Sequence, residues 1–221
     1  MVVDILIAVA TALLRLFEMN MLRRVGRGEF VSIEEALASD RRITAVAVTG
    51  AIAVLVTAIV WFVWEFRAHA NLRAARLSGL QYSPGWAVGW WFVPFANLVM
   101  PFAAVRELWK ASDSRDDWWK TRTWPVVGWW WASYLLAGVV GTVGSITSDQ
   151  ESPRISGLIA TDMWIIAAQI VVVIAAVLAI LIVRSVVRRQ DALLLVRGGA
   201  DGTPPPPPRP DVSESGLPPG P

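Results

Sequence analysis

Long runs of apolar residues alternate with short charged segments along this chain. Three runs contain no charged residue, at positions 43–64, 123–148 and 163–183. A helix needs about 20 apolar residues to cross the roughly 30 Å hydrocarbon core of a bilayer, so each run is long enough. Few amphipathic segments are left that could cover these runs in water. We therefore predict three transmembrane helices, at about 43–64, 124–147 and 163–183.

The N-terminal segment is apolar but carries charges. Residues 2–20 include Asp4, Arg15, Glu18 and Asn20. A charge at the bilayer centre costs about 2.5–3.5 kcal/mol on insertion scales. Asp4 and Glu18 would lie near the two interfaces. Arg15 lies on the same helix face as Glu18, which follows it by three residues. We predict a fourth span at about 2–20. A cleaved signal peptide is the alternative, although the segment has Asp4 and no basic residue at its start.

The region 77–105 is uncharged as well, but prolines interrupt it at Pro84, Pro94 and Pro101. Each proline removes a backbone donor, and lipid offers no water to satisfy the broken hydrogen-bond ladder. We therefore predict an interfacial or shallow re-entrant segment here, with a full crossing as the alternative. The residues that follow, 98–112, have helical amphipathic spacing and predict a helix in the plane of the interface.

Two local signals predict helix starts and contacts. Ser32 and Glu35 form a capping box, which predicts a short helix that leads into the second span. Gly138, Gly141 and Gly144 recur every three residues in the third span. Small residues allow helices to approach closely, and we expect this contact within one bundle rather than between two copies.

Charge distribution predicts the orientation. Eight Arg or Lys residues lie between the second and third spans, and further arginines follow the last span. The positive-inside rule then places this central loop and both termini in the cytoplasm, with the protein in the plasma membrane. All tryptophans except Trp164 lie on or near that side. They form either an aromatic belt with a bundle core, or an aromatic pocket that faces lipid or a ligand.

The composition narrows the function classes. The net charge is only +2, so we expect no nucleic-acid partner. The chain has no cysteine and a single histidine, His69, which excludes thiolate and multi-histidine metal sites. It also lacks the common phosphate-loop, nucleophile-elbow and zinc-hydrolase motifs, so we expect neither a cofactor nor an enzyme. Three spans with almost no ionisable groups argue against an ion path within one monomer.

Three motifs occupy the region between the second and third spans. They are W-x-x-R-x-x-x-N from Trp64 to Asn71, S-P-G-W-x-x-G-W-W-F-x-P-x-x-N-L-x-x-P from Ser83 to Pro101, and R-E-L-W-x-x-S from Arg106 to Ser112. Together they resemble an uncharacterised family of bacterial, largely actinobacterial, multi-pass membrane proteins known as a domain of unknown function. The resemblance covers residues 1 to about 190. It implies a membrane location and a multi-helix fold, and it implies no activity.

These motifs supply the candidate interaction or structural residues. They are Trp64, Arg67, Asn71, Ser83, Pro84, Gly85, Trp86, Gly89, Trp90, Trp91, Pro94, Asn97, Pro101, Arg106, Glu107 and Trp109. Arg67 and Asn71 share one helix face, where they would fix the loop by hydrogen bonds or contact a ligand. Asn97 is expected to cap the next helix or to tie the loop to the bundle.

The sequence therefore predicts an all-α transmembrane bundle of about four spans within residues 1–190. Residues 191–221 should form a disordered, proline-rich cytoplasmic tail, because the run at 204–208 favours an extended polyproline conformation.

We expect a structural, scaffolding, lipid-interacting or partner-interacting role through the cytoplasmic aromatic face. The alternative is a small transporter or oligomeric channel component that uses segment 85–97. The expected partners are the bilayer, a cytoplasmic protein or a second copy of the chain. Anionic headgroups are further candidates, through Arg106, Lys110, Arg115, Lys120 and Arg122.

Overall fold

The computed structural model describes residues 1–113, 117–147 and 154–201, and all its regular elements there are helical. The α-helices are α1 (Val2–Gly26), α2 (Ile33–Ala74), α3 (Pro84–Gly89), α4 (Met100–Ala111), α5 (Pro125–Thr147) and α6 (Ile155–Asp201). Three short 3-10 helices lie between them: η1 (Trp90–Phe92), η2 (Ala96–Leu98) and η3 (Trp118–Lys120). The prediction of an all-α fold is confirmed.

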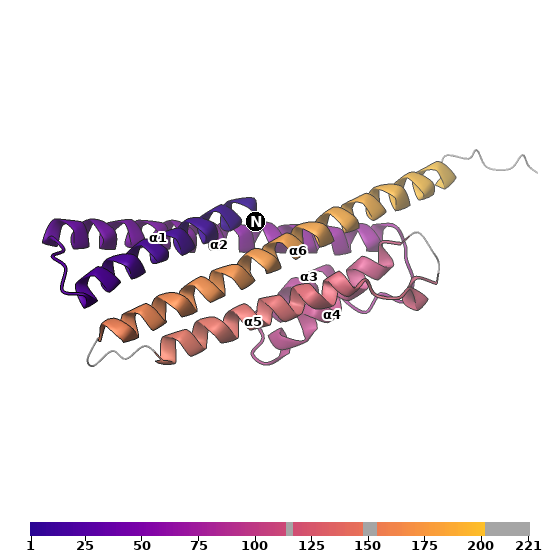
Figure 1. Ribbon diagram of the computed structural model, residues 1–221. Helices are drawn as coiled ribbons and strands as arrows, with labels where there is room; N and C mark the ends of the chain where they lie inside the picture. Colours follow the sequence, from indigo (N-terminus) through magenta and orange to yellow (C-terminus); the bar gives the residue numbers. More distant parts are fainter. Residues whose placement is uncertain (114–116, 148–153, 202–221) are drawn as a thin grey trace, which may run out of the picture.

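The four long helices α1, α2, α5 and α6 form an elongated bundle (Figure 1). Helix α6 packs against both α1 and α5, and α1 packs against α2. At 1.5 Å per residue, the 42 residues of α2 span about 63 Å and the 47 residues of α6 about 70 Å. Both helices therefore extend well beyond a hydrocarbon core of roughly 30 Å.

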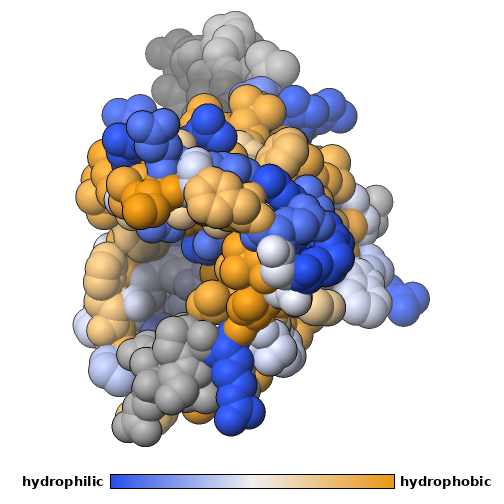
Figure 2. All heavy atoms as spheres, turned by 60° about the vertical axis from the view of Figure 1, so that its left-hand side comes forward, coloured by the Kyte–Doolittle hydropathy of each residue, from blue (hydrophilic) through white to orange (hydrophobic). Residues whose placement is uncertain are grey.

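Among the described residues, three helices are long and apolar enough to cross a membrane: Ile33–Ala74, Pro125–Gly144 and Ile155–Leu193. They contain the whole of the uncharged runs 43–64 and 163–183 and most of the run 123–148. Many of their apolar side chains point outward. Ile52 and Leu55 of α2, for example, are 59 % and 62 % exposed. Orange, hydrophobic side chains cover much of the face in Figure 2, and the surface there is hollowed on one side. An exposed apolar surface of this kind requires a covering such as lipid.

The prediction of a fourth span is not confirmed. Residues 2–20 do lie in a helix, α1, but that helix is not among the three that are apolar enough. Its charges face neighbouring groups. Arg15 donates to Glu18 at 2.7 Å and to Asp162 of α6 at 3.2 Å, and Asp4 accepts from Thr57 of α2 at 2.7 Å. The predicted shared face of Arg15 and Glu18 is confirmed.

The capping box at the start of α2 is present, because the Ser32 hydroxyl accepts from the Glu35 backbone N–H at 3.1 Å. The short helix predicted there continues without a break into the second span. No proline occurs between Ser32 and Ala74, so nothing in the sequence forces the helix to end before the membrane.

The proline-rich region is broken into short pieces, as its composition predicts. α3, η1 and η2 follow one another, and Phe95 adopts a left-handed φ of 63° between η1 and η2. α4 then begins with Pro101 in its first turn, where a missing N–H costs nothing. The position of this region relative to the membrane stays a prediction.

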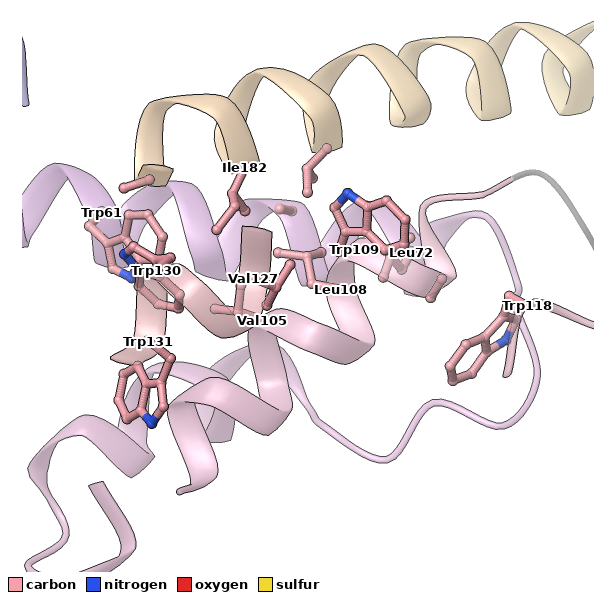
Figure 3. Close-up of a cluster of buried hydrophobic side chains, with 14 of the residues drawn as sticks. Trp61, Leu72, Val105, Leu108, Trp109, Trp118, Val127, Trp130, Trp131 and Ile182 are labelled. Carbon is pink, nitrogen blue, oxygen red and sulfur yellow. The ribbon is translucent and has the colours of Figure 1, made fainter. Parts of the chain in front are cut away.

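Helix α6 continues to Asp201 and so includes the first residues of the predicted tail. The proline run at 204–208 lies outside the described residues. The buried core gathers where the second half of α2, α4, the start of α5 and the second half of α6 meet (Figure 3). Ile182 of α6 points there toward Val127 of α5 and Leu108 of α4.

Candidate functional site

Tryptophan side chains form the centre of this core. Trp61 of α2 stacks on Trp130 of α5, with ring centroids 5.3 Å apart. Trp91 of η1 approaches Trp61, Trp131 and Tyr134 edge-on, at 6.4, 5.9 and 5.6 Å. Trp61, Trp130 and Trp131 are buried. The sequence left open an aromatic belt with a bundle core or an aromatic pocket that faces lipid or a ligand. The burial of these three rings places them in the bundle core, and Trp61 and Trp130 also border the cavity described below.

A buried carboxylate lies beside these rings. Glu65 is 0 % exposed, and its Oε2 accepts from the indole nitrogens of Trp61 at 3.1 Å and Trp91 at 3.0 Å. Its Oε1 is buried and has no hydrogen-bond partner in the described part of the chain. Among those residues no cationic side chain forms an ion pair with it. The two indole donors are therefore the groups that hold the carboxyl group in place.

The sequence pattern did not single out Glu65, which appeared as the charge that ends the second span. One signal was available, because Trp61 and Glu65 are four residues apart and therefore share a helix face. His69 continues this row. Its Nδ1 lies 3.0 Å from the Glu65 carbonyl oxygen, and its Nε2 is buried without a hydrogen-bond partner among the described residues.

A cavity of about 950 Å³ lies next to the indoles, between α2, α5, α6 and the start of α1. Trp61, Trp91, Trp130 and Tyr134 form part of its wall. Where α5 and α6 face it, most of the lining residues are small or aliphatic: Ala137, Gly138, Val139, Val172, Ala175, Ala176 and Ala179. The cavity thus exists where short side chains leave space between long helices. Its few polar lining groups include Asp4, Thr57, Asn97 and Thr142.

This geometry corrects the expectation for the three glycines of α5. A Cβ at Gly144 would lie 2.9 Å from the Cβ of Trp164, so this glycine permits close contact with α6. A Cβ at Gly138 or Gly141 would meet nothing within 4 Å. Only Gly144 therefore supports the predicted close helix contact, whereas Gly138 opens the wall of the cavity.

Asn97 does not cap α4, contrary to one of the two roles expected for it. The N-cap of α4 is Val99, which has no capping side-chain bond. Asn97 lies in η2 and contributes to the cavity wall, and its backbone N–H donates to the Val93 carbonyl at 2.9 Å. The irregular backbone around Phe95 places it there, which is not visible from local spacing.

The first motif divides into two roles. Asn71 donates to Gln190 of α6 at 3.2 Å, and Gln190 donates to the Ala68 carbonyl at 2.9 Å and to the Ser112 hydroxyl at 3.3 Å. This amide network links α2, α6 and the end of α4. Arg67 is exposed and does not join it. The two motif residues therefore do not act together on the loop, although they share a helix face.

Glu107 of the third motif holds the two residues that come directly before the second motif. Its carboxylate accepts from the backbone N–H groups of Gln81 at 2.8 Å and Tyr82 at 3.1 Å, and so holds the segment before α3. Burial raises the pKa of Glu107 above its ordinary value, although these two donors and the charge of Arg73 act in the opposite direction. Ser83 caps α3 by accepting from the Trp86 N–H at 3.2 Å. Glu107 is therefore a buried anchor rather than part of a solvated helix face.

The other motif residues have mainly structural positions. The ring centroids of Trp64 and Trp61 lie 4.9 Å apart, and those of Trp86 and Trp90 lie at the same distance. Arg106 lies 5.9 Å from the Phe102 ring. The five glycine and proline residues of the motifs lie in turns and loops. Pro84 and Pro101 occupy the first turns of α3 and α4, Gly89 lies against the Trp86 ring, and Gly85 and Pro94 are exposed. Trp109 donates to Ser185 of α6 at 3.1 Å.

The sequence was compared with models of known protein families, and one of these models matches most of the chain. A model of the family described as a domain of unknown function, DUF4328, matches residues 27–188. The chain belongs to the DUF4328 family. The match confirms the resemblance over this range, which holds the three motifs, Glu65 and most of the cavity wall. It begins after α1, whereas we expected the resemblance to start at residue 1. No curated protein and no solved structure matches this DUF4328 chain.

Proposed function

We propose that this protein is an integral membrane protein that binds a lipid-like amphiphile, whose hydrocarbon chain occupies the cavity between α2, α5 and α6. The cavity itself carries the proposal. Its volume of about 950 Å³ lies at the upper end of the roughly 300–1,000 Å³ that is usual for ligand pockets. The helices that form most of its wall are the three that are apolar enough for a membrane. Lipid is therefore the medium from which a ligand would enter.

The lining chemistry favours a hydrocarbon chain over a polar solute. Alanine, valine, leucine and tryptophan side chains dominate the wall, and a polar solute would leave its own groups without hydrogen-bond partners against them. The charged lining groups, the Met1 amine and Asp4, pair with each other, and Thr57, Asn97 and Thr142 alone are too few to enclose a charged substrate. They are sufficient to orient one polar atom of an amphiphile.

Glu65 acts in this proposal as a positioning residue. It does not line the cavity itself, but it accepts hydrogen bonds from Trp61 and Trp91, which both line the cavity. A fixed acceptor between two indoles restricts their rotation and thereby sets the shape of the wall.

The same proposal includes the plasma membrane as the location, with both termini in the cytoplasm, and a binding rather than a catalytic role. A cytoplasmic protein partner or a second copy of the chain is compatible with it, and nucleic acid is not part of it. A small transporter is the second candidate function. It is favoured by one observation, because Trp91 and Asn97 from the predicted re-entrant region line the same cavity.

The test uses the purified full-length protein in lipid nanodiscs with a photoactivatable, alkyne-bearing palmitate. Gly138→Leu should place an apolar side chain in the cavity, because Gly138 lines it and a Cβ there meets nothing within 4 Å. We expect crosslinking to fall by about tenfold, which corresponds to roughly 1.4 kcal/mol of lost binding. Mass spectrometry of the crosslinked peptides should place the label on α2, α5 and α6.

Gly141→Leu is the matched control. It makes the same substitution on the same helix, and a Cβ at Gly141 also meets nothing within 4 Å, but Gly141 does not line the cavity. Wild-type labelling is expected for this variant. Equal labelling of both variants, or equal loss in both, would contradict the cavity as the binding site. A scramblase assay with fluorescent phospholipid in proteoliposomes separates the second candidate, since a binding protein without transport leaves the inner-leaflet probe protected.

A further inference from the structure

A second pocket, of about 630 Å³, lies at the other side of the tryptophan core. It is formed where α4, the start of α5 and the second half of α6 meet, and seven residues line it: Trp109, Arg122, Thr123, Trp124, Pro125, Ser185 and Arg189. No lining residue is shared with the apolar cavity. Its chemistry also differs, because two arginines and two hydroxyl groups converge on it.

We propose that this pocket is a binding site for a phosphate group, such as the headgroup phosphate of an anionic phospholipid, with Arg122 and Arg189 as its cationic ligands. Arginine is suited to this task because its planar guanidinium presents several donors that match phosphate oxygens. Thr123 and Ser185 add hydroxyl donors to the same wall.

Arg189 is held in place but keeps donor capacity. Its guanidinium carbon lies 3.8 Å from the ring centroid of Trp109, so the group is stacked on the indole. Trp109 is fixed in turn by its hydrogen bond to Ser185 and by stacking on Trp124, with centroids 6.1 Å apart. The Nη1 atom of Arg189 is buried without a hydrogen-bond partner among the described residues. A prepositioned cation with an unused donor is what an anion site requires.

The neighbouring charges leave the pocket positive. The acidic group recorded near Arg189 is Asp113, whose Oδ2 lies 3.7 Å from Nη1. That distance exceeds the roughly 2.7–2.9 Å of a charge-assisted hydrogen bond, so the ion pair does not use the full donor capacity of Arg189. Lys120 pairs with Asp117 at 3.5 Å, and Arg122 is exposed at the mouth of the site. The two lining arginines therefore bring two positive charges, and among the described residues Asp113 is the acid that pairs with one of them.

The position of the pocket along the helices fits a headgroup. Arg122 immediately precedes the uncharged run that contains α5, and Arg189 follows the end of the uncharged run of α6 by a little under two turns. Both arginines thus lie where the apolar part of each helix ends. The N-terminus of α5, at Pro125, also faces the pocket, and the partial positive charge of a helix N-terminus adds to the attraction for an anion.

The experiment titrates the full-length protein in detergent with phosphatidylglycerol, with phosphatidylcholine or with inorganic phosphate, and counts bound molecules by native mass spectrometry. We expect phosphatidylglycerol to bind at one saturable site. Arg122→Glu should weaken this binding by about tenfold or more, as expected when a charge-assisted contact is lost and replaced by repulsion. Because Arg122 is exposed, this substitution is not expected to disturb the fold.

Arg188→Glu is the matched control, because Arg188 is an exposed neighbour of Arg189 on α6 that does not line the pocket. Its effect should be less than about twofold if the site rather than general charge governs binding. Arg189→Lys retains the charge but loses the stacked planar group, so it should weaken phosphatidylglycerol binding. Thermal unfolding of this variant checks that its stability is unchanged.

The lipid and the free anion give distinguishable support. Competition by inorganic phosphate identifies the phosphate group itself as sufficient, whereas binding of phosphatidylglycerol without such competition assigns the site to a membrane headgroup. Equal affinity for phosphatidylglycerol and phosphatidylcholine, or binding unaffected by Arg122→Glu, overturns the proposal. Gly138→Leu should leave this binding unchanged, so failure here is separable from failure of the cavity proposal.

Discussion

Replacement of Glu65 by leucine tests the organisation of the tryptophan core. The substitution removes the acceptor of two indole N–H groups, that of the buried Trp61 and that of the half-buried Trp91. A buried donor left without an acceptor costs about 1–3 kcal/mol, so the two donors together cost about 2–6 kcal/mol. Burial of the leucine side chain offsets part of this cost. We therefore expect the free energy of unfolding to fall by at least about 2 kcal/mol.

Glu65→Gln separates the loss of the acceptor from the loss of the acid. The glutamine carbonyl oxygen can take the place of Oε2 and accept from both indoles. We expect this variant to lose less stability than the leucine variant and to keep the near-ultraviolet circular dichroism of the tryptophans. Unfolding in mixed micelles with increasing sodium dodecyl sulfate measures all variants under one condition.

Glu34→Leu is the matched control, because Glu34 is an exposed acid in the first turn of the same helix. Its loss removes only a favourable contact with the helix N-terminus, worth less than about 1 kcal/mol. A double-mutant cycle with Trp91→Phe should show coupling to Glu65, since the phenyl ring has no N–H to satisfy. If Glu65→Leu were no more destabilising than Glu34→Leu, the carboxylate would not be what holds the indoles, and our account of the cavity wall would be refuted.

Three further substitutions test the packing with the same unfolding assay. Gly144→Leu should destabilise the protein by about 1–3 kcal/mol, because its Cβ would meet Trp164 at 2.9 Å, whereas Gly141→Leu should not destabilise it. Similar unfolding free energies for the two variants would refute the close contact. Gln190→Leu removes the amide link between α2 and the end of α4 and should cost about 1–3 kcal/mol; a neutral effect would show the link to be dispensable. Because burial raises the pKa of Glu107, the folded state holds this proton to higher pH than the unfolded chain, and this contribution to stability falls as pH rises above about 4.3. Glu107→Gln should abolish this decrease in stability with pH, which can be measured from unfolding midpoints between about pH 4 and 7. An unchanged pH dependence in the variant would assign the effect to other groups.

The predicted elements that the structure confirms depend on local pattern. Uncharged runs of 21 or more residues without an internal proline favour a long helix. Such helices contain the runs 43–64 and 163–183 and most of the run 123–148. The capping box at Ser32 and the proline at the start of α4 are likewise determined within a few residues. Prolines also break the region 77–105 into short pieces, because no fold can restore the missing backbone donors.

The fourth span shows where local pattern is insufficient. The charges of α1 are compatible with a membrane position only if partners exist for them. Those partners come from distant parts of the chain: Asp162 lies 147 residues from Arg15, and Thr57 lies 53 residues from Asp4. Hydropathy along α1 contains no information about either contact.

The sequence by itself determined the helical class, three apolar helices and the family, because each depends on composition or spacing within a continuous segment. Tertiary structure decided that Glu65 is enclosed by indoles, that Gly138 borders a cavity while Gly144 closes a contact, and that Arg122 and Arg189 share a pocket. These features depend on which faces of separate helices meet. Helix packing is set by the summed fit of many side chains, so no single segment of the sequence encodes it.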